Sequence, residues 1–196
     1  MHYPTQAALL LRLRDDDLRV RQALLERGLL SDGYNPDMEQ VHRRNASLLQ
    51  QLIDQIGWPT AEKVGDEASR AAWLLVQHAI SLPAFMRFCL KLLEREVETG
   101  GADPIRYAFL YDRIALYEDR PQRYGTQFVG DETGRLVPHQ LDGPVQVVNQ
   151  RRRALGLNSV EERQLELTRE AGPQPAMDYA RRAAYDAWRR QVGWLD

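Results

Sequence analysis

Two histidines that fall on apolar helix faces are the side chains of this sequence best suited to acid–base chemistry. Asn35-Pro36-Asp37 carries the signals of a helix start, and Gly57 those of a stop, so residues 36–56 are predicted to be helical. On a helical wheel, an apolar stripe falls within about 60° of one direction, and His42 lies inside it. That stripe is made of Met38, Leu49, Leu52, Ile53 and Ile56. Imidazole titrates near pH ~6.5, so an inward histidine can exchange protons at neutral pH.

Two further polar residues accompany His42 on this helix. Asn45 lies inside the same stripe and Glu39 at its edge. Buried polar groups need partners, so another part of the protein or a ligand must meet them. A core histidine bonded to a neighbouring helix is the structural alternative to a ligand site.

The second histidine, His78, lies near the end of a predicted helix over residues 66–80. The run Ala71-Ala72-Trp73-Leu74-Leu75-Val76 is apolar almost all round, which predicts a central, buried helix. His78 falls on an apolar side of this helix. Gln77 falls on the side of Asp66 and Arg70, where solvent is an equally good partner.

Asp112 is the carboxylate that we expect to meet one of the imidazoles. It lies between Ile105, Ala108 and Leu116 on a helix predicted from Pro104 to about Tyr117. A lone buried carboxylate is costly unless it is paired, and Arg113 points about 100° away on the wheel. His42 or His78 would serve as the donor. The alternative is that Asp112 forms an ion pair with a purely structural role.

The densest polar motif outside a helix is Gln122-Arg123-Tyr124-Gly125-Thr126-Gln127. On an extended strand its side chains alternate between two faces, and Gly125 allows the close approach of a backbone or ligand. These amide and phenol groups are suited to hydrogen bonding with a polar small molecule. The structural alternative is that they form hydrogen bonds between the two strands of a hairpin.

These residues suggest two classes of function. In the first, a metal-independent and cofactor-free hydrolase, lyase or isomerase uses His42 and His78 for proton transfer, with Asp112 orienting one ring. Arg113 would hold an anionic group of a polar substrate, and the remaining binding residues would be Glu39, Asn45, Gln77, Gln122, Tyr124 and Gln127. In the second, the chain is a ligand-binding or protein-interaction module, and the same groups form only a buried network.

A mononuclear metal enzyme is a further alternative. His42, His78 and Glu39 or Asp112 make up a donor set that suits zinc or ferrous iron. Glu39-x-x-His42 has the spacing of carboxylate di-iron bundles, but the second such pair that those bundles need is missing. Zincin, phosphate-loop, dinucleotide and nucleophile-elbow motifs are also missing from the sequence.

Five ordered blocks of the chain resemble a bacterial domain-of-unknown-function family. They are Met38-Glu39-Gln40-Val41-His42, Gly57-Trp58-Pro59, the run from Ala72 to Ala79, Asp112-Arg113 and the run from Gln122 to Gln127. The resemblance covers roughly residues 15–157 and brings no established activity with it. It implies that the residues beyond about Asn158 are an addition particular to this protein.

Composition excludes several classes of partner. The net charge is −2, with 26 Lys and Arg against 28 Asp and Glu, which disfavours nucleic acid and anionic lipid. The single cysteine, Cys89, excludes an internal disulfide and a thiolate metal cluster. Neither a signal segment nor a stretch approaching the ~18 apolar residues of a membrane span is present, so we expect a soluble, cytoplasmic protein.

The expected fold is mainly α. It comprises a helical domain over residues 1–157, with a small β-hairpin near 122–141, and a C-terminal helical extension over 158–196. Further helices are predicted at 4–28, 83–100 and 144–155, and Ser159-Val160-Glu161-Glu162 forms a capping box. We expect His42, Asn45, His78 and Asp112 to converge in one pocket, with residues 122–127 at its rim.

The last helix follows the linker Gly172-Pro173-Gln174-Pro175 and forms a C-terminal arm. Its predicted apolar stripe consists of Met177, Ala180, Ala184 and Trp188. An isolated helix of this length is marginal in water, so the stripe must pack on its own domain or on a second subunit. We expect the arm to be dispensable for the pocket and to support a homo-oligomer.

Overall fold

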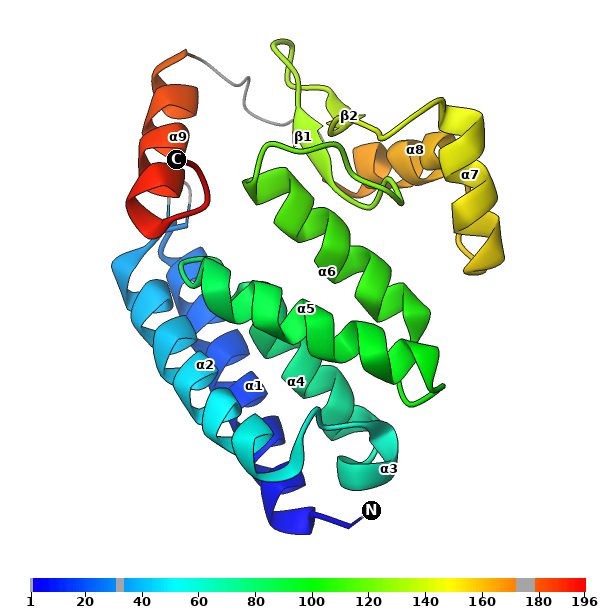
Figure 1. Ribbon diagram of the computed structural model, residues 1–196. Coiled ribbons are helices and arrows are strands. Elements are labelled where there is room, and N and C mark those ends of the chain that lie inside the picture. Colours follow the sequence, from blue (N-terminus) through cyan, green and yellow to red (C-terminus); the bar gives the residue numbers. More distant parts are fainter. Residues whose placement is uncertain (1, 31–33, 172–178) are drawn as a thin grey trace. The chain divides into compact units, whose positions relative to one another are not determined.

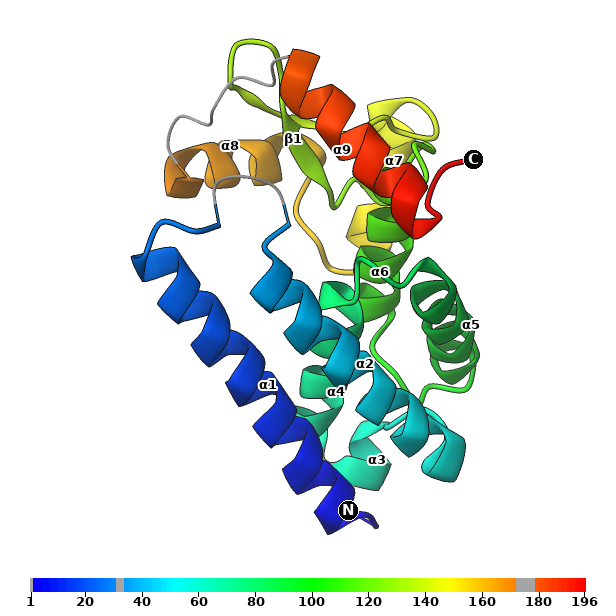
Figure 2. The ribbon, with the colours of Figure 1, turned by 90° about the vertical axis from the view of Figure 1, so that its left-hand side faces the viewer.

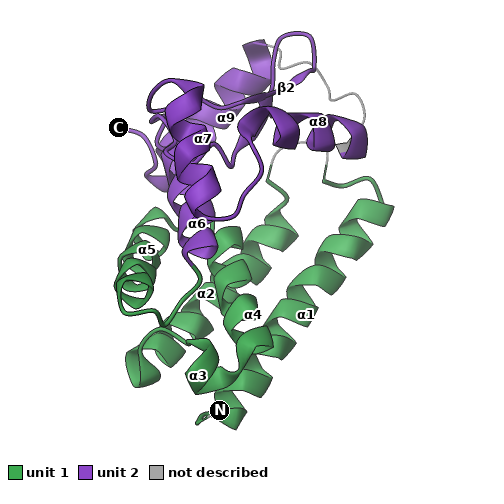
Figure 3. Ribbon diagram, turned by 90° about the vertical axis from the view of Figure 1, so that its right-hand side faces the viewer, with its two compact units in different colours: residues 1–103 green, residues 104–196 purple. Residues whose placement is uncertain are grey.

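A computed structural model describes residues 2–30, 34–171 and 179–196 of this chain. Its contacts divide the chain into two compact units, unit 1 over Met1–Asp103 and unit 2 over Pro104–Asp196 (Figure 3). The sequence pattern had favoured a domain boundary between residues 157 and 158 instead.

The regular elements among the described residues of unit 1 are all helices, in agreement with the mainly α prediction. Its elements are α1 (Pro4–Glu26), α2 (Pro36–Ile56), α3 (Ala61–Val64), α4 (Asp66–His78) and α5 (Pro83–Glu98) (Figure 1). The short helix α3 was not predicted; the Thr60 side chain caps it by accepting a hydrogen bond from the amide of Lys63.

Helix α4 lies at the centre of unit 1, as its apolar sequence predicts. It contacts α1, α2, α3 and α5, and Ala71, Ala72 and Val76 are completely buried. Helices α1 and α2 lie side by side and both pack on α4 (Figure 2). Any polar side chain that α1, α2 and α4 turn towards one another is thus removed from water.

The predicted start of α2 is confirmed. The Asn35 side chain accepts hydrogen bonds from the amides of Asp37 and Met38, and Pro36 occupies the first helical position. At the other end, the Lys63 ammonium group donates to the carbonyls of Ile56 and Trp58. Both ends of α2 are therefore fixed by local contacts.

Unit 2 combines four helices with a hairpin among its described residues. Its elements are α6 (Pro104–Tyr117), β1 (Phe128–Gly130), β2 (Leu136–Pro138), α7 (Val145–Ala154), α8 (Val160–Ala171) and α9 (Tyr179–Val192). The strands pair antiparallel, with Val129 opposite Val137, and occupy only a small part of the hairpin predicted near residues 122–141. The capping box is confirmed, because Ser159 and Glu162 each accept a hydrogen bond from the other's amide.

The C-terminal arm packs on α6 in a way that the sequence did not predict. Tyr117 of α6 stacks on Trp194 and contacts Trp188 edge-on, with ring centroids 5.1 and 6.0 Å apart. The buried guanidinium of Arg189 donates to the carbonyl of Tyr117 at 3.1 Å.

The predicted apolar stripe of the arm is only partly correct. Ala180 and Ala184 are exposed, whereas Trp188, the last residue of the predicted stripe, packs on Tyr117 together with Trp194. Met177 and the predicted linker at 172–175 lie outside the described residues.

Among the described residues, every helix is too short or too polar to cross a membrane.

Candidate functional site

The two predicted histidines come together in unit 1 around a carboxylate that the sequence analysis did not single out. Asp17 of α1 is completely buried, and its Oδ1 lies 2.9 Å from Nδ1 of His78 on α4. An ionised carboxylate only accepts hydrogen bonds, so Nδ1 of His78 carries the proton. In neutral His78 the lone pair is then on Nε2, which receives no hydrogen bond from the described residues.

His42 of α2 approaches the other oxygen of the same carboxylate. Its Nε2 lies 3.3 Å from Oδ2 of Asp17, close enough for an ion pair but not aligned for a hydrogen bond. Its Nδ1 lies 2.6 Å from the hydroxyl oxygen of Tyr34. With the His42 proton on Nε2, the Tyr34 hydroxyl donates to Nδ1. The two imidazole rings are 5.2 Å apart between centroids, so both histidines belong to one cluster.

Burial and the two imidazoles act on Asp17 in opposite directions. Removal from water raises the pKa of the carboxyl group, whereas the close contacts with the imidazoles of His42 and His78 lower it, and the net pKa lies well below the ordinary value. Asp17 therefore stays ionised at neutral pH. An ionised, buried carboxylate stabilises any positive charge that forms on either ring.

The helix period of α1 explains why Asp17 points inward. Leu10, Leu13 and Leu24 are buried on α1, and Asp17 lies seven residues after Leu10, four after Leu13 and seven before Leu24. These spacings place all four on one face. A wheel drawn for α1 would have revealed Asp17, although it is the last of three consecutive aspartates. Tyr34 follows the loop after α1, and no periodicity marks it.

Asp17, His42 and His78 are also a donor set that could hold a metal ion. One ligand atom from each residue lies within 4.8 Å of the other two. Oδ2 of Asp17 and Nε2 of His42 are buried and have no hydrogen-bond partner among the described residues. Two imidazoles and one carboxylate suit zinc or ferrous iron. The predicted metal alternative had paired the histidines with Glu39 or Asp112.

The other predicted residues of unit 1 are Asn45, Glu39 and Gln77. Asn45 is buried, donates to the carbonyl of Leu13 at 3.3 Å, and accepts from Arg44. Glu39 binds Arg43 one turn further along α2, as a half-exposed ion pair. Gln77 is buried rather than solvated.

Asp112 belongs to unit 2, where its carboxylate meets backbone amides rather than an imidazole. Its two oxygens accept hydrogen bonds from the amides of Arg123, Tyr124 and Thr126 at 2.8–3.1 Å. Burial raises the pKa of Asp112, and these bonds lower it in part. The prediction that Asp112 would orient a histidine is therefore corrected: in this structure Asp17 contacts both rings.

The segment 122–127 is a tight loop instead of the predicted strand. The buried Gln122 side chain donates to the carbonyls of Gln127 and His139 and accepts from the Gln127 amide. The buried Arg152 guanidinium donates to the carbonyls of Tyr124 and Gly125. Asp112 and Arg152 thus fix the amides and the carbonyls of the same loop.

Gly125 is the point of closest approach in this loop. Its φ of +63° favours glycine, and a Cβ atom here would lie 2.8 Å from Val160 and 3.2 Å from Val148. The close approach predicted for this glycine is therefore made by side chains of α7 and α8.

The remaining predicted binding residues also lie in unit 2. Tyr124 is half-buried, and its ring packs edge-on against Tyr107 and Tyr111. The Gln127 side chain donates to the hydroxyl of Thr126, and Arg113 is half-buried on α6.

The fold and the cluster together define a mainly helical protein with a buried carboxylate shared by two histidines. The chain belongs to a family of unknown function, DUF6624, which it matches over residues 4–172. The match extends beyond the predicted 15–157 and includes α8, whereas α9 lies outside it. Neither a curated protein nor a solved structure matches this chain.

Proposed function

We propose that this protein is an enzyme that uses histidine acid–base chemistry on a small polar substrate, with His78 as the general base. The observation that carries the proposal is the 2.9 Å contact between Nδ1 of His78 and Oδ1 of Asp17. This contact holds the imidazole in the tautomer that leaves Nε2 free to accept a proton. It also supplies a negative charge beside the imidazolium that proton transfer creates.

Exposure supports the same assignment. The side chain of His78 is 22% exposed, whereas Asp17 has no exposed surface. A substrate can therefore reach His78 while the carboxylate behind it stays shielded from water, and shielding strengthens the electrostatic interaction. His42, whose side chain is 9% exposed, is the proposed second proton carrier, and Tyr34 orients it through Nδ1.

The reaction class that we propose is hydrolysis, elimination or isomerisation, because each needs a proton to be taken up and returned. Asp17 replaces Asp112 as the residue that orients the base. An anionic group on the substrate stays part of the proposal. We further propose a bacterial, cytoplasmic protein that acts without nucleic acid.

The first test measures the tautomer of His78. Long-range proton–nitrogen correlation spectra of 15N-labelled protein distinguish Nδ1–H from Nε2–H in a neutral imidazole. We expect Nδ1–H for His78 in the wild type, and a mixture of tautomers in Asp17→Asn. A wild-type His78 that carries its proton on Nε2 would overturn the assignment of this residue as the base.

The second test measures catalysis with a panel of p-nitrophenyl carboxylate and phosphate esters between pH 5 and 9. His78→Gln keeps hydrogen bonding but cannot take up a proton, so we expect it to lose about 10²-fold or more in rate. His2→Gln is the matched control, because His2 is an exposed histidine of the same unit. Equal rates for His78→Gln and the wild type would contradict the proposal.

A mononuclear metal enzyme is the second candidate function. It is favoured by the 3.3 Å separation of Asp17 Oδ2 and His42 Nε2, two buried atoms without a hydrogen-bond partner among the described residues. Tetrahedral zinc with ligand bonds of about 2.0–2.1 Å brings neighbouring ligand atoms to a similar separation. Metal analysis of protein purified without an affinity tag decides between the two. Stoichiometric zinc or iron would replace the acid–base proposal with this one.

A ligand-binding or interaction module is the alternative without catalysis. His42→Gln separates it from the enzyme, because glutamine keeps hydrogen bonding but does not titrate. Loss of ester turnover with an unchanged circular dichroism spectrum would support the enzyme. Binding of a ligand at full strength by His42→Gln would support the module.

A further inference from the structure

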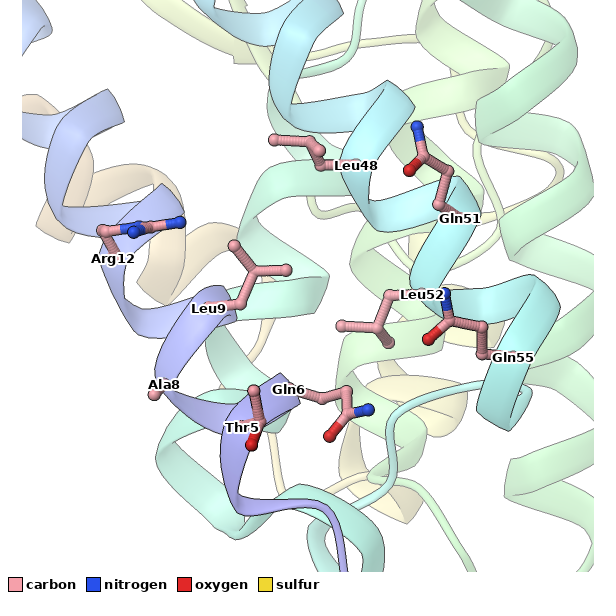
Figure 4. Close-up of a pocket in the computed structure, with 9 residues that line it drawn as sticks. All are labelled: Thr5, Gln6, Ala8, Leu9, Arg12, Leu48, Gln51, Leu52 and Gln55. Carbon is pink, nitrogen blue, oxygen red and sulfur yellow. The ribbon is translucent and has the colours of Figure 1, made fainter.

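A groove runs between α1 and α2, at the part of this helix pair nearer to the start of α1. Its volume is about 540 Å³, which is sufficient for a small molecule. Leu9, Leu48 and Leu52 project into the space between the two helices and form an apolar floor (Figure 4). A hydrocarbon portion of a ligand would be removed from water on this floor.

Polar side chains surround the apolar floor. Arg12 and Gln6 of α1 reach towards α2, and Gln55 of α2 reaches back towards α1, with Gln51 beside it (Figure 4). These four side chains make no hydrogen bond or ion pair with the residues that the structure describes. Three amides offer donors and acceptors, and the guanidinium offers only donors.

The charge of the groove is positive. Arg12 is the charged residue among those that line it, and no acidic side chain belongs to the lining. By contrast, Arg14 on the same helix binds Asp15 and Glu67 at 2.8 Å. One turn beyond the groove on each helix, Asp16 and Arg44 lie 3.5 Å apart and bridge α1 to α2. Arg12 is thus available to an anion, and a carboxylate matches the fork of its donors.

We propose that this groove binds a small amphiphilic carboxylate, such as an N-acylated amino acid. The carboxylate would pair with Arg12, the amide of the ligand would bond to the glutamine side chains, and the acyl chain would lie on the leucines. The proposal does not depend on the Asp17–His42–His78 cluster, because none of those residues lines the groove.

N-octanoylglycine is the probe for this proposal, and N-octanoylglycinamide is its uncharged counterpart. Titration of 15N-labelled full-length protein reports binding through the side-chain amide signals of Gln6, Gln51 and Gln55. We expect saturable shifts of these signals with N-octanoylglycine and roughly tenfold weaker binding of the amide. Equal affinity for the two compounds, shifts confined to other residues, or no saturable shift up to about 5 mM would each overturn the proposal.

Variants of two arginines complete the experiment. Arg12→Gln removes the charge in the groove and is expected to weaken N-octanoylglycine binding about tenfold, without changing the affinity for the amide. Arg21→Gln is the matched control, since Arg21 is an exposed residue of α1 that does not line the groove. A larger effect of Arg21→Gln than of Arg12→Gln would show that binding follows general charge rather than this groove.

Discussion

Asp17 and His78 lie 61 positions apart in the sequence, yet their side chains meet at 2.9 Å in the core of unit 1. The carboxylate is fully buried, and the imidazole is the part of the pair that solvent reaches. A buried charge is tolerated only when partners compensate for its desolvation. The fold thus keeps the ionised Asp17 behind the partly exposed His78. The desolvation of this carboxylate costs free energy that an apolar side chain in the same place would not cost.

Replacement of Asp17 tests how strongly unit 1 depends on this pair. Asp17→Asn removes the charge that faces both imidazoles, so we expect the free energy of unfolding to fall by roughly 3 kcal/mol. Urea denaturation at pH 7 measures the change. Asp16→Asn is the matched control, because Asp16 is half-exposed and its ion pairs with Arg19 and Arg44 are 3.5 Å long; we expect a loss below about 1 kcal/mol. Similar losses for both variants would contradict this account.

The lowered pKa of Asp17 predicts a pH dependence of stability. A carboxyl group whose pKa is lower in the folded than in the unfolded state contributes stability above its unfolded value, which is about 4. That contribution is lost as the pH falls further and both states become protonated. We therefore expect the stability difference between wild type and Asp17→Asn to shrink from pH 6 to pH 3. Urea denaturation at four pH values measures it, and a constant or growing difference would argue against an ionised Asp17.

Replacement of Asp112 should affect unit 2 alone. Asp112→Asn keeps the size of the side chain but loses the charge that accepts bonds from three backbone amides. We expect a loss of roughly 2 kcal/mol and faster hydrogen exchange at residues 123–126. Asp119→Asn is the control, because Asp119 is exposed and its φ of +54° suits asparagine. A changed tautomer of His78 in Asp112→Asn would restore the predicted link between this acid and the histidines.

Removal of residues 173–196 tests the role of the C-terminal arm. The deletion uncovers Tyr117, which loses its contacts with Trp188 and Trp194. We expect a stability loss of roughly 3 kcal/mol and an unchanged His78 tautomer. Light scattering measures whether the mass in solution also changes, which a homo-oligomer held together by the arm requires. An unaltered melting temperature would show that α9 is not part of the core of unit 2.

Local signals in the sequence determined most of the helices. Asn35-Pro36 fixed the start of α2, and the Ser159–Glu162 capping box fixed that of α8, because these contacts span only two or three residues. Helical periodicity likewise identified His42 and Asp112 as buried, since a helix face depends only on spacing. Burial of these side chains was therefore predictable without knowledge of the fold.

Only the tertiary structure decided which buried polar groups meet. The wheel shows that Asp112 needs donors, but it cannot distinguish an imidazole from the backbone amides of a loop whose first donor, Arg123, lies eleven residues later. Asp17 reaches His42 and His78 because α1 packs on both α2 and α4, and the rotation of each helix about its axis aligns the three faces. Packing across 25 and 61 residues sets those rotations, and a pattern of period 3.6 within one helix carries no information about them.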